Sequence, residues 1–101
     1  MIIYVDIDET ICSTGDDRNY SNSIPLLENI RKINDLYDKG NEIIYWTARG
    51  SGTGIDWKDI TNNQLDAWGA KRTKVLFGKP VYDLFICDKA INSNLFFSKN
   101  I

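Results

Sequence analysis

Residues 2–10 read Ile-Ile-Tyr-Val-Asp-Ile-Asp-Glu-Thr, and this stretch decides the fold. Residues 2–7 are β-branched, aromatic or otherwise apolar apart from Asp6, which is typical of a strand buried on both faces in a parallel sheet. A polar loop over residues 12–23 follows the strand. We therefore expect a buried strand with two acidic residues, Asp6 and Asp8, at its end.

Helical and strand patterns alternate along the rest of the chain. An apolar stripe at helical spacing begins at about Pro25 and ends at Gly40, and a second helix is predicted from an N-cap at Asp56 to Trp68. Further elements are predicted as strands over residues 42–47, 74–77 and 83–87 and a short helix that carries Leu95, Phe96 and Phe97. This alternation predicts an α/β fold, a three-layer Rossmann-like open parallel sheet with flanking helices.

The composition predicts one small globular domain over residues 1–101. Apolar residues make up 43% of the chain and charged residues 26%, both ordinary for such a domain. The net charge of −2 disfavours a nucleic-acid partner, and no apolar run approaches the roughly 18 residues of a membrane span. Cys12 and Cys87 lie far apart in sequence. We expect a cytoplasmic protein with no disulfide framework and no membrane partner.

The chain contains no histidine, which excludes several kinds of site. Catalytic triads and dyads that need an imidazole base are excluded, as are His-ligated zinc sites. Two cysteines cannot supply a four-thiolate zinc site either. Acid–base chemistry therefore falls to carboxylates, lysine, tyrosine or cysteine.

Polar side chains stand where the predicted strands end. Asp6 and Asp8 end the first strand, Thr47 ends the second, and Lys79 and Asp88 follow the third and fourth. Ligands of open parallel sheets bind at this edge. Three carboxylates close together either have raised pKa values or hold a cation among them, and hard oxygen ligands favour Mg²⁺. Mg²⁺ and lysine could neutralise a phosphoryl group while an aspartate attacks its phosphorus.

Residues 6–10, Asp-Ile-Asp-Glu-Thr, resemble the first signature of the haloacid dehalogenase-like (HAD) superfamily of aspartate-nucleophile phosphotransferases. Thr47 resembles the second motif, Lys79 the third, and Asp88 the fourth, where Cys87 stands at a position that is often aspartate. The resemblance runs in order through the whole chain.

Two short stretches narrow the resemblance. Residues 47–50 and 78–80 are similar to those of small bacterial capsule- and polysaccharide-biosynthesis phosphatases. Larger members of the superfamily carry an inserted cap domain. Here residues 10–25 form only a flap-sized loop, and residues 47–74 hold one helix. The resemblance therefore implies a capless chain.

The resemblance implies a role for each motif residue. Asp6 would be the nucleophile that forms an aspartyl-phosphate, and Asp8 the general acid–base. Thr47 would bind a phosphoryl oxygen, and Lys79 would neutralise the nucleophile and the phosphate. The implied Mg²⁺ site consists of Asp6, Asp8 and Asp88, with Asn92 holding a metal-bound water or supporting a ligand.

Substrate recognition is assigned to residues within or directly after the first two motifs. Arg49, Thr10 and Gly50 are the candidates, because an arginine fork can hold a second anionic group and glycine-rich backbone can approach an anion. We expect residues 13–23 and 49–55 to form the only walls of the phosphate pocket.

The third motif leaves an alternative open. Only Gly78 to Tyr82 separate the third and fourth predicted strands, too few residues for a crossover helix. The third strand would then be short, and Lys74 or Lys71 could take the place of Lys79.

The sequence predicts an Mg²⁺-dependent phosphomonoester hydrolase that acts through an aspartyl-phosphate on a small phosphorylated sugar or related metabolite. A polynucleotide end phosphatase is an alternative that also fits a capless site. A catalytically silent binding module that keeps the HAD fold is another, although intact Asp6 and Asp8 count against it. An open site further suits a homo-oligomer in which a neighbouring subunit covers it.

Overall fold

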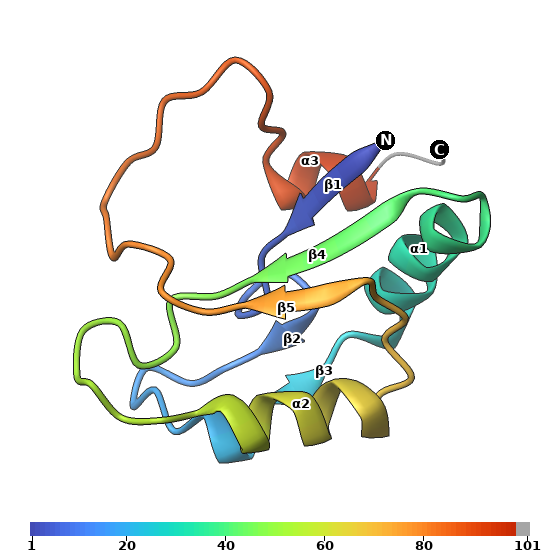
Figure 1. Ribbon diagram of the computed structural model, residues 1–101. Helices are drawn as coiled ribbons and strands as arrows, with labels where there is room; N and C mark the ends of the chain where they lie inside the picture. The colour runs from blue at the N-terminus through green and yellow to red at the C-terminus, as the bar shows by residue number, and fades with distance from the viewer. Residues whose placement is uncertain (99–101) are drawn as a thin grey trace.

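A parallel three-stranded sheet forms the centre of the computed structural model, which describes residues 1–98. Its strands are β1 (Ile2–Val5), β4 (Glu42–Trp46) and β5 (Lys74–Leu76), in the order β1-β4-β5 (Figure 1). Val5 pairs with Tyr45, and Tyr45 pairs with Val75. The three strands therefore end at nearly the same level, and the residues after them meet at one edge.

Two helices connect these strands, and a small hairpin precedes the first. Helix α1 (Leu27–Asp38) leads into β4, and α2 (Lys58–Ala67) leads into β5. Before α1 the chain forms β2 (Cys12–Ser13), the 3-10 turn η1 (Tyr20–Asn22) and β3 (Ile24–Pro25). The predicted order of the main strands and helices is confirmed up to β5. The stretch 12–23, predicted as a loop, contains β2 and η1, Pro25 belongs to β3, and the helix begins at Leu27.

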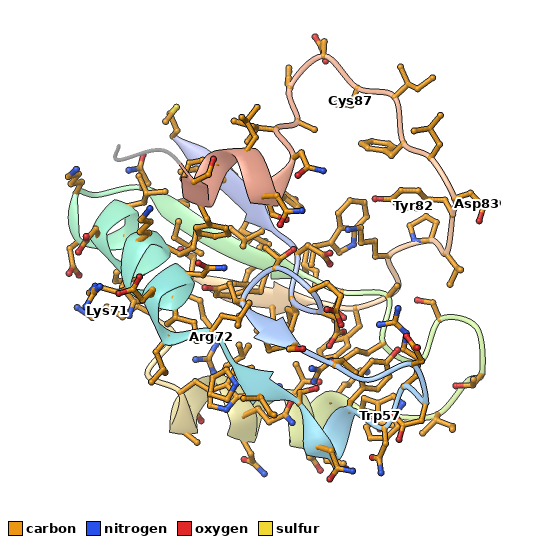
Figure 2. The ribbon with its side chains drawn as sticks, turned by 180° about the vertical axis from the view of Figure 1, so that it is seen from behind. Trp57, Lys71, Arg72, Tyr82, Asp83 and Cys87 are labelled. Carbon is orange, nitrogen blue, oxygen red and sulfur yellow. The ribbon has the colours of Figure 1, made fainter. Side chains whose placement is uncertain are left out.

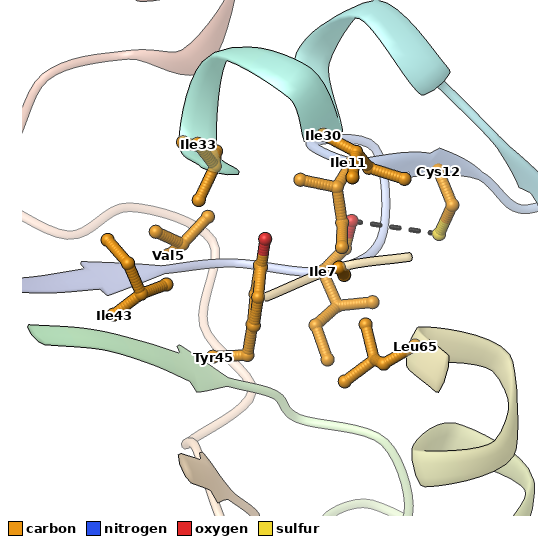
Figure 3. Packing of buried hydrophobic residues seen from close by; sticks show 10 residues of the cluster. Val5, Ile7, Ile11, Cys12, Ile30, Ile33, Ile43, Tyr45 and Leu65 are labelled. Atoms are coloured by element: carbon orange, nitrogen blue, oxygen red, sulfur yellow. Dashed lines mark hydrogen bonds between the residues drawn. The ribbon is translucent and has the colours of Figure 1, made fainter. Parts of the chain in front are cut away.

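The core lies on one face of the sheet. Alternate residues of the strands, such as Val5 and Tyr45, pack against Ile33 of α1 and Leu65 of α2 (Figure 3). The short helix α3 (Ser93–Ser98), which the sequence predicts, adds Phe96 and Phe97 to the same cluster.

The opposite face of β1 is exposed. Ile2 keeps 64% of its surface exposed and Tyr4 keeps 53%, so the prediction that this strand is buried on both faces is wrong. Both crossovers run in the same direction across the sheet, and connections of one hand place their helices on one face. The parallel α/β sheet is therefore as expected, but residues 1–98 show two layers instead of three.

The predicted fourth strand is wrong. Residues 80–92, which we call the arm, form neither helix nor strand, and every one of them is exposed. The arm leaves the end of β5, projects beyond β1 and returns to α3, with Cys87 near its tip (Figures 1 and 2). Strand-forming composition gives a strand only where a neighbouring edge is available, and the short connection after β5 does not bring residues 83–87 to one. Within residues 1–98 no helix is long and apolar enough to cross a bilayer.

Tyr45 brings an unpaired hydroxyl into this core. Its side chain is fully buried beside Ile33 and Val5, and the hydroxyl oxygen has no hydrogen-bond partner among the described residues. Burial raises the pKa of the phenol, so the group stays neutral. We predict that Tyr45→Phe raises the free energy of unfolding by about 1 kcal/mol, because a buried polar group without a partner is destabilising.

Urea denaturation measures this change. Tyr37→Phe, at a partly exposed position on α1, is the matched control and should change stability by less than about 0.5 kcal/mol. Destabilisation by Tyr45→Phe would mean that the hydroxyl is hydrogen-bonded in solution.

Candidate functional site

Asp6 and Lys79 meet at the carboxyl ends of the strands. The ammonium nitrogen of Lys79 lies 3.3 Å from Oδ1 of Asp6. The backbone N–H of Lys79 donates to the carbonyl oxygen of Thr47 over 3.1 Å, which fixes the lysine beside the end of β4. Its ammonium also lies 5.5 Å from the ring centre of Trp46, a cation–π contact.

The alternative lysines lie elsewhere. Lys74 begins β5, at the opposite end of that strand. Lys71 pairs with Asp38 over 2.8 Å on the helical side of the molecule. The geometry therefore places Lys79, and neither alternative, beside the first motif, although the connection after β5 is short.

The carboxylate of Asp8 forms a bidentate ion pair with the guanidinium of Arg49. Nε of Arg49 donates to Oδ2 of Asp8 over 3.0 Å, and a terminal nitrogen donates to Oδ1 over 2.9 Å. The arginine side chain is fully buried, and that of Asp8 is 14% exposed. Two parallel hydrogen bonds between ionised groups make this the strong, geometrically fixed form of an ion pair.

The rest of the Arg49 side chain is held by neighbouring elements. One terminal nitrogen donates to the hydroxyl of Thr61 and to the amide oxygen of Gln64 on α2, over 3.1 and 2.6 Å. The ring of Tyr20 covers the guanidinium at 4.7 Å. We expect from the sequence that Arg49 binds substrate. In the structure its guanidinium points inward to Asp8, because the buried carboxylate of Asp8 needs a countercharge.

The pKa of Asp8 lies below its ordinary value. Burial alone would raise it, but hydrogen bonds from Arg49 and Thr14 and the positive charge of Arg49 outweigh the burial. The Thr14 hydroxyl donates to Oδ1 over 2.6 Å. Asp8 is thus an ionised carboxylate at neutral pH, which suits a proton acceptor better than the general acid implied by the resemblance.

A tight turn after β1 sets the direction of Asp8. Glu9 has a φ of +61°, a left-handed conformation that L-residues rarely adopt. Its carboxylate accepts the backbone N–H of Thr14 over 2.9 Å. Thr10 is buried, and its carbonyl oxygen accepts a hydrogen bond from Asn29 on α1. We expect Thr10 to bind substrate, but its observed contact is internal.

Thr47 and Gly50 hold the loop that follows β4. The buried Thr47 hydroxyl accepts the backbone N–H of Arg49 over 3.1 Å, so it positions the arginine's backbone. Gly50 has a φ of +83°, and an added Cβ would overlap the carbonyl oxygen of Ile55. The glycine is therefore required for this close approach of two backbone segments.

A hollow of about 330 Å³ opens beside the site. Residues 49–55 supply only part of its wall, and residues 13–23 supply none, because they fold over Arg49 instead. The start of α2 and the turn after β5 complete it. Its lining residues are Arg49, Gly50, Ser51, Gly54, Ile55, Asp56, Trp57, Lys58, Phe77 and Gly78. Residues 13–23 and 49–55 are predicted to wall the phosphate pocket, and this hollow has a different lining.

The predicted Mg²⁺ site is not assembled within one chain. Asp88 lies on the exposed arm, and no group of three acidic, cysteine or histidine side chains in residues 1–98 could hold a metal ion. Asn92 caps α3, where its side-chain oxygen accepts the backbone N–H of Asn94 over 2.9 Å. The site residues therefore do not fit the expected metal within one chain.

Sequence reasoning missed the residues that support the Asp8–Arg49 pair. Cys12 is fully buried and its thiol lies 3.5 Å from Oδ1 of Asp8; burial and the charge of Asp8 raise the pKa of this thiol to about 11. Thr61 and Gln64 are three residues apart on one side of α2. That polar pair, within a stripe that also carries Leu65, is the signal that could have shown an inward-facing polar contact.

We predict that Arg49→Ala lowers the free energy of unfolding by about 3–5 kcal/mol, because it leaves the buried carboxylate of Asp8 unpaired. Arg31→Ala is the control, since its ion pair with Glu28 is exposed and should contribute less than about 1 kcal/mol. The double variant Asp8→Asn with Arg49→Met should recover part of the loss, because neither charge then remains buried. Equal losses in Arg49→Ala and Arg31→Ala would contradict the prediction.

The same pair predicts how stability depends on pH. Because the pKa of Asp8 is lower in the folded chain than its ordinary value of 3.8, its stabilising contribution is present above pH 3.8 and is lost as the pH falls through the folded-state pKa. The stability difference between the wild type and Arg49→Ala should therefore shrink in acid. Urea denaturation at pH 7 and at about pH 3 measures it; an unchanged difference would show that the pair carries no such linkage.

The fold is similar to that of a solved structure. No family model and no curated protein matches the chain. The crystal structure of a structural-genomics target from Vibrio cholerae is similar with a TM-score of 0.85 and 27% sequence identity, over 99% of this chain and 89% of that chain. Its description names no activity.

Proposed function

We propose that the chain is a phosphomonoester hydrolase in which Asp6 is the nucleophile. The observation that carries this proposal is the ion pair between Asp6 and Lys79 at the carboxyl ends of the parallel strands. The Asp6 side chain is 43% exposed. That of Asp8 is 14% exposed and accepts two hydrogen bonds from Arg49. Asp6 is therefore the accessible acid of the two, and it has a cation beside it.

The described residues support a two-step hydrolysis. In the first step a carboxylate oxygen of Asp6 forms a bond to phosphorus, the bond from phosphorus to the substrate oxygen breaks, and the ammonium of Lys79 neutralises the phosphoryl oxygens. In the second step water attacks the phosphorus of the aspartyl-phosphate. Asp8 takes the proton of that water, inorganic phosphate leaves and the Asp6 carboxylate is restored.

The leaving oxygen also needs a proton in the first step. The resemblance assigns its delivery to Asp8, but the lowered pKa leaves Asp8 without a proton at neutral pH. A phosphomonoester monoanion carries its own proton, which can move to the leaving oxygen as the bond breaks. We propose that the monoanion is the form that reacts, and that Asp8 acts as the base of the second step.

Mg²⁺ remains part of the proposal as an expectation of the resemblance. Within one chain its third carboxylate, Asp88, is not beside Asp6 and Asp8, so the two steps are written from the side chains of one chain without the metal. The source of that carboxylate is taken up in the next subsection.

The hollow favours a small substrate. It lies beside the site, and Trp57 at its wall offers a planar surface for a sugar ring or a similar group. A polynucleotide is less well supported, because Lys71 and Arg72 are paired with Asp38 and Asp66 and do not form a basic strip with the buried Arg49 (Figure 2). We propose that the protein is capless and cytoplasmic. Cys12 and Cys87 are both free thiols, in keeping with this setting.

We predict that Asp6→Asn lowers the turnover of an aryl phosphate by several orders of magnitude, because the amide cannot attack phosphorus. Lys79→Met should also lower it strongly, since the developing phosphoryl charge loses its cation. Asp59→Asn, an exposed acid in the first turn of α2, is the control and should keep wild-type turnover. Retention of radiolabelled phosphate on acid-quenched wild type, and not on Asp6→Asn, would establish the covalent intermediate; full turnover in Asp6→Asn would end the proposal.

The pH–rate profile tests which group supplies the proton. Because the second pKa of a phosphomonoester lies near about 6, we predict that turnover falls as the pH rises above that value. A substrate with a good leaving group needs no proton, so an aryl phosphate with an acidic phenol should lose less rate than an alkyl phosphate. A plateau from pH 5 to about pH 8 for the alkyl phosphate would instead assign the proton to a protein group.

A further inference from the structure

The arm is apolar and uncovered. Ile86 keeps 88% of its surface exposed, and the residues on either side of it are exposed as well. Few folded monomers leave a contiguous apolar segment exposed to water. Apolar surface of this kind marks an interaction site. Six large apolar side chains take part: Val81, Tyr82, Leu84, Phe85, Ile86 and Ile91.

The outer edge of β1 is also uncovered. Among residues 1–98, β1 pairs only with β4, so the other side of the strand has no hydrogen-bonding neighbour. The exposed side chains of Ile2 and Tyr4 stand on this strand. An apolar strand edge of this kind is a template for an added strand.

The arm of the same chain cannot fill this edge as a parallel strand. Only residues 77–82 join β5 to the segment 83–87, whereas a parallel crossover needs a dozen residues or more. The other end of the arm is tied to α3, which packs against the core through Phe96 and Phe97. An antiparallel approach would leave Asp88 at the wrong end of the sheet for the site.

We propose that two copies of this chain exchange arms, so that residues 83–87 of one copy form a parallel strand against β1 of the other. This inference rests on the proposed function, because it completes that site with Asp88 of the partner subunit. Each copy both gives and receives an arm, which makes the contact symmetric and closed at two chains.

One register satisfies both the apolar pattern and the site. With Cys87 opposite Val5, Asp88 lies opposite Asp6. Because parallel neighbours at the same level point to the same face, Leu84 and Ile86 then lie beside Ile2 and Tyr4. The exposed apolar residues of the arm and of β1 thus cover each other in the register that brings the third carboxylate to the site.

The area involved is large enough for a stable dimer. Leu84, Phe85 and Ile86 on each of two arms, with the surfaces that they cover, amount to roughly 1,500 Å², within the range of specific interfaces. Pairing along β1 adds backbone hydrogen bonds to this contact.

The first experiment measures the mass of the full chain in solution by sedimentation velocity. We expect a dimer for the wild type and a monomer for Ile86→Lys, since the lysine would replace the apolar contact between Ile86 and the partner's Tyr4 with a charge. In the single chain Ile86 is 88% exposed, so its replacement leaves the monomer folded. Leu27→Lys, an exposed apolar position on α1, is the matched control and should stay dimeric. A monomeric wild type, or a dimeric Ile86→Lys, overturns the proposal.

The second experiment asks whose Asp88 completes each site. Asp6→Asn lacks the nucleophile and Asp88→Asn lacks the third carboxylate, so each alone should be inactive. After mixing and exchange of subunits, half of the dimers are mixed and each holds one complete site, which restores about a quarter of the wild-type activity. A mixture that stays inactive although the subunits exchange overturns the transfer of Asp88.

A thermal readout separates this inference from the proposed function. Mg²⁺ should raise the melting temperature of the wild-type dimer and leave that of Ile86→Lys and Asp88→Asn unchanged, whatever the catalytic activity. A dimer with this shift but without phosphatase activity would overturn the proposed function and keep the arm exchange. An active monomer would overturn the arm exchange and keep the proposed function.

Discussion

The buried pair of Asp8 and Arg49 is the interaction on which the rest of the structure depends. A buried carboxylate without a countercharge costs several kcal/mol, about as much as the total stability of many small domains. The turn after β1 places Asp8, and the loop after β4 places Arg49. The hairpin and α2 then enclose the arginine through Tyr20 and Gln64. Four separate segments therefore have to assemble together for any one of them to be stable.

The same pair gives two aspartates only two residues apart different environments. Asp8 is held ionised and fixed in direction, so it can take a proton without moving. Asp6 points to the accessible side of the strand end, where Lys79 is its cationic neighbour. Because Arg49 is committed to Asp8, Lys79 is the cation beside Asp6 that remains for a phosphoryl group. Burial, more than residue type, thus determines which acid could act as nucleophile and which as base.

Local sequence patterns predicted the helices and strands well. They predicted less well where long side chains point and which strands pair over a long distance in sequence. The apolar strands and the helical stripe gave β1, β4, β5 and α1 within a few residues, because hydrophobic periodicity reports burial. Lys79 was also placed correctly, since strand ends converge in a parallel sheet. The inward turn of Arg49 could not be predicted, because a flexible side chain follows the nearest buried charge. Residues 83–87 have a strand's composition, but composition does not specify which edge, or which copy, the strand joins.

The proposed arm exchange connects assembly to the charge balance of the site. Within one chain, Asp6 and Asp8 are balanced by Lys79 and Arg49. A third carboxylate brought to this edge leaves the cluster with a net charge of −1, which opposes the docking of the arm. A divalent cation reverses that excess and attracts all three acids. Arm exchange and cation binding should therefore favour each other by the same free energy, because coupling between two binding events is reciprocal. A single chain with its arm extended escapes the repulsion, but it leaves apolar side chains in water and the proposed cation site without its third carboxylate.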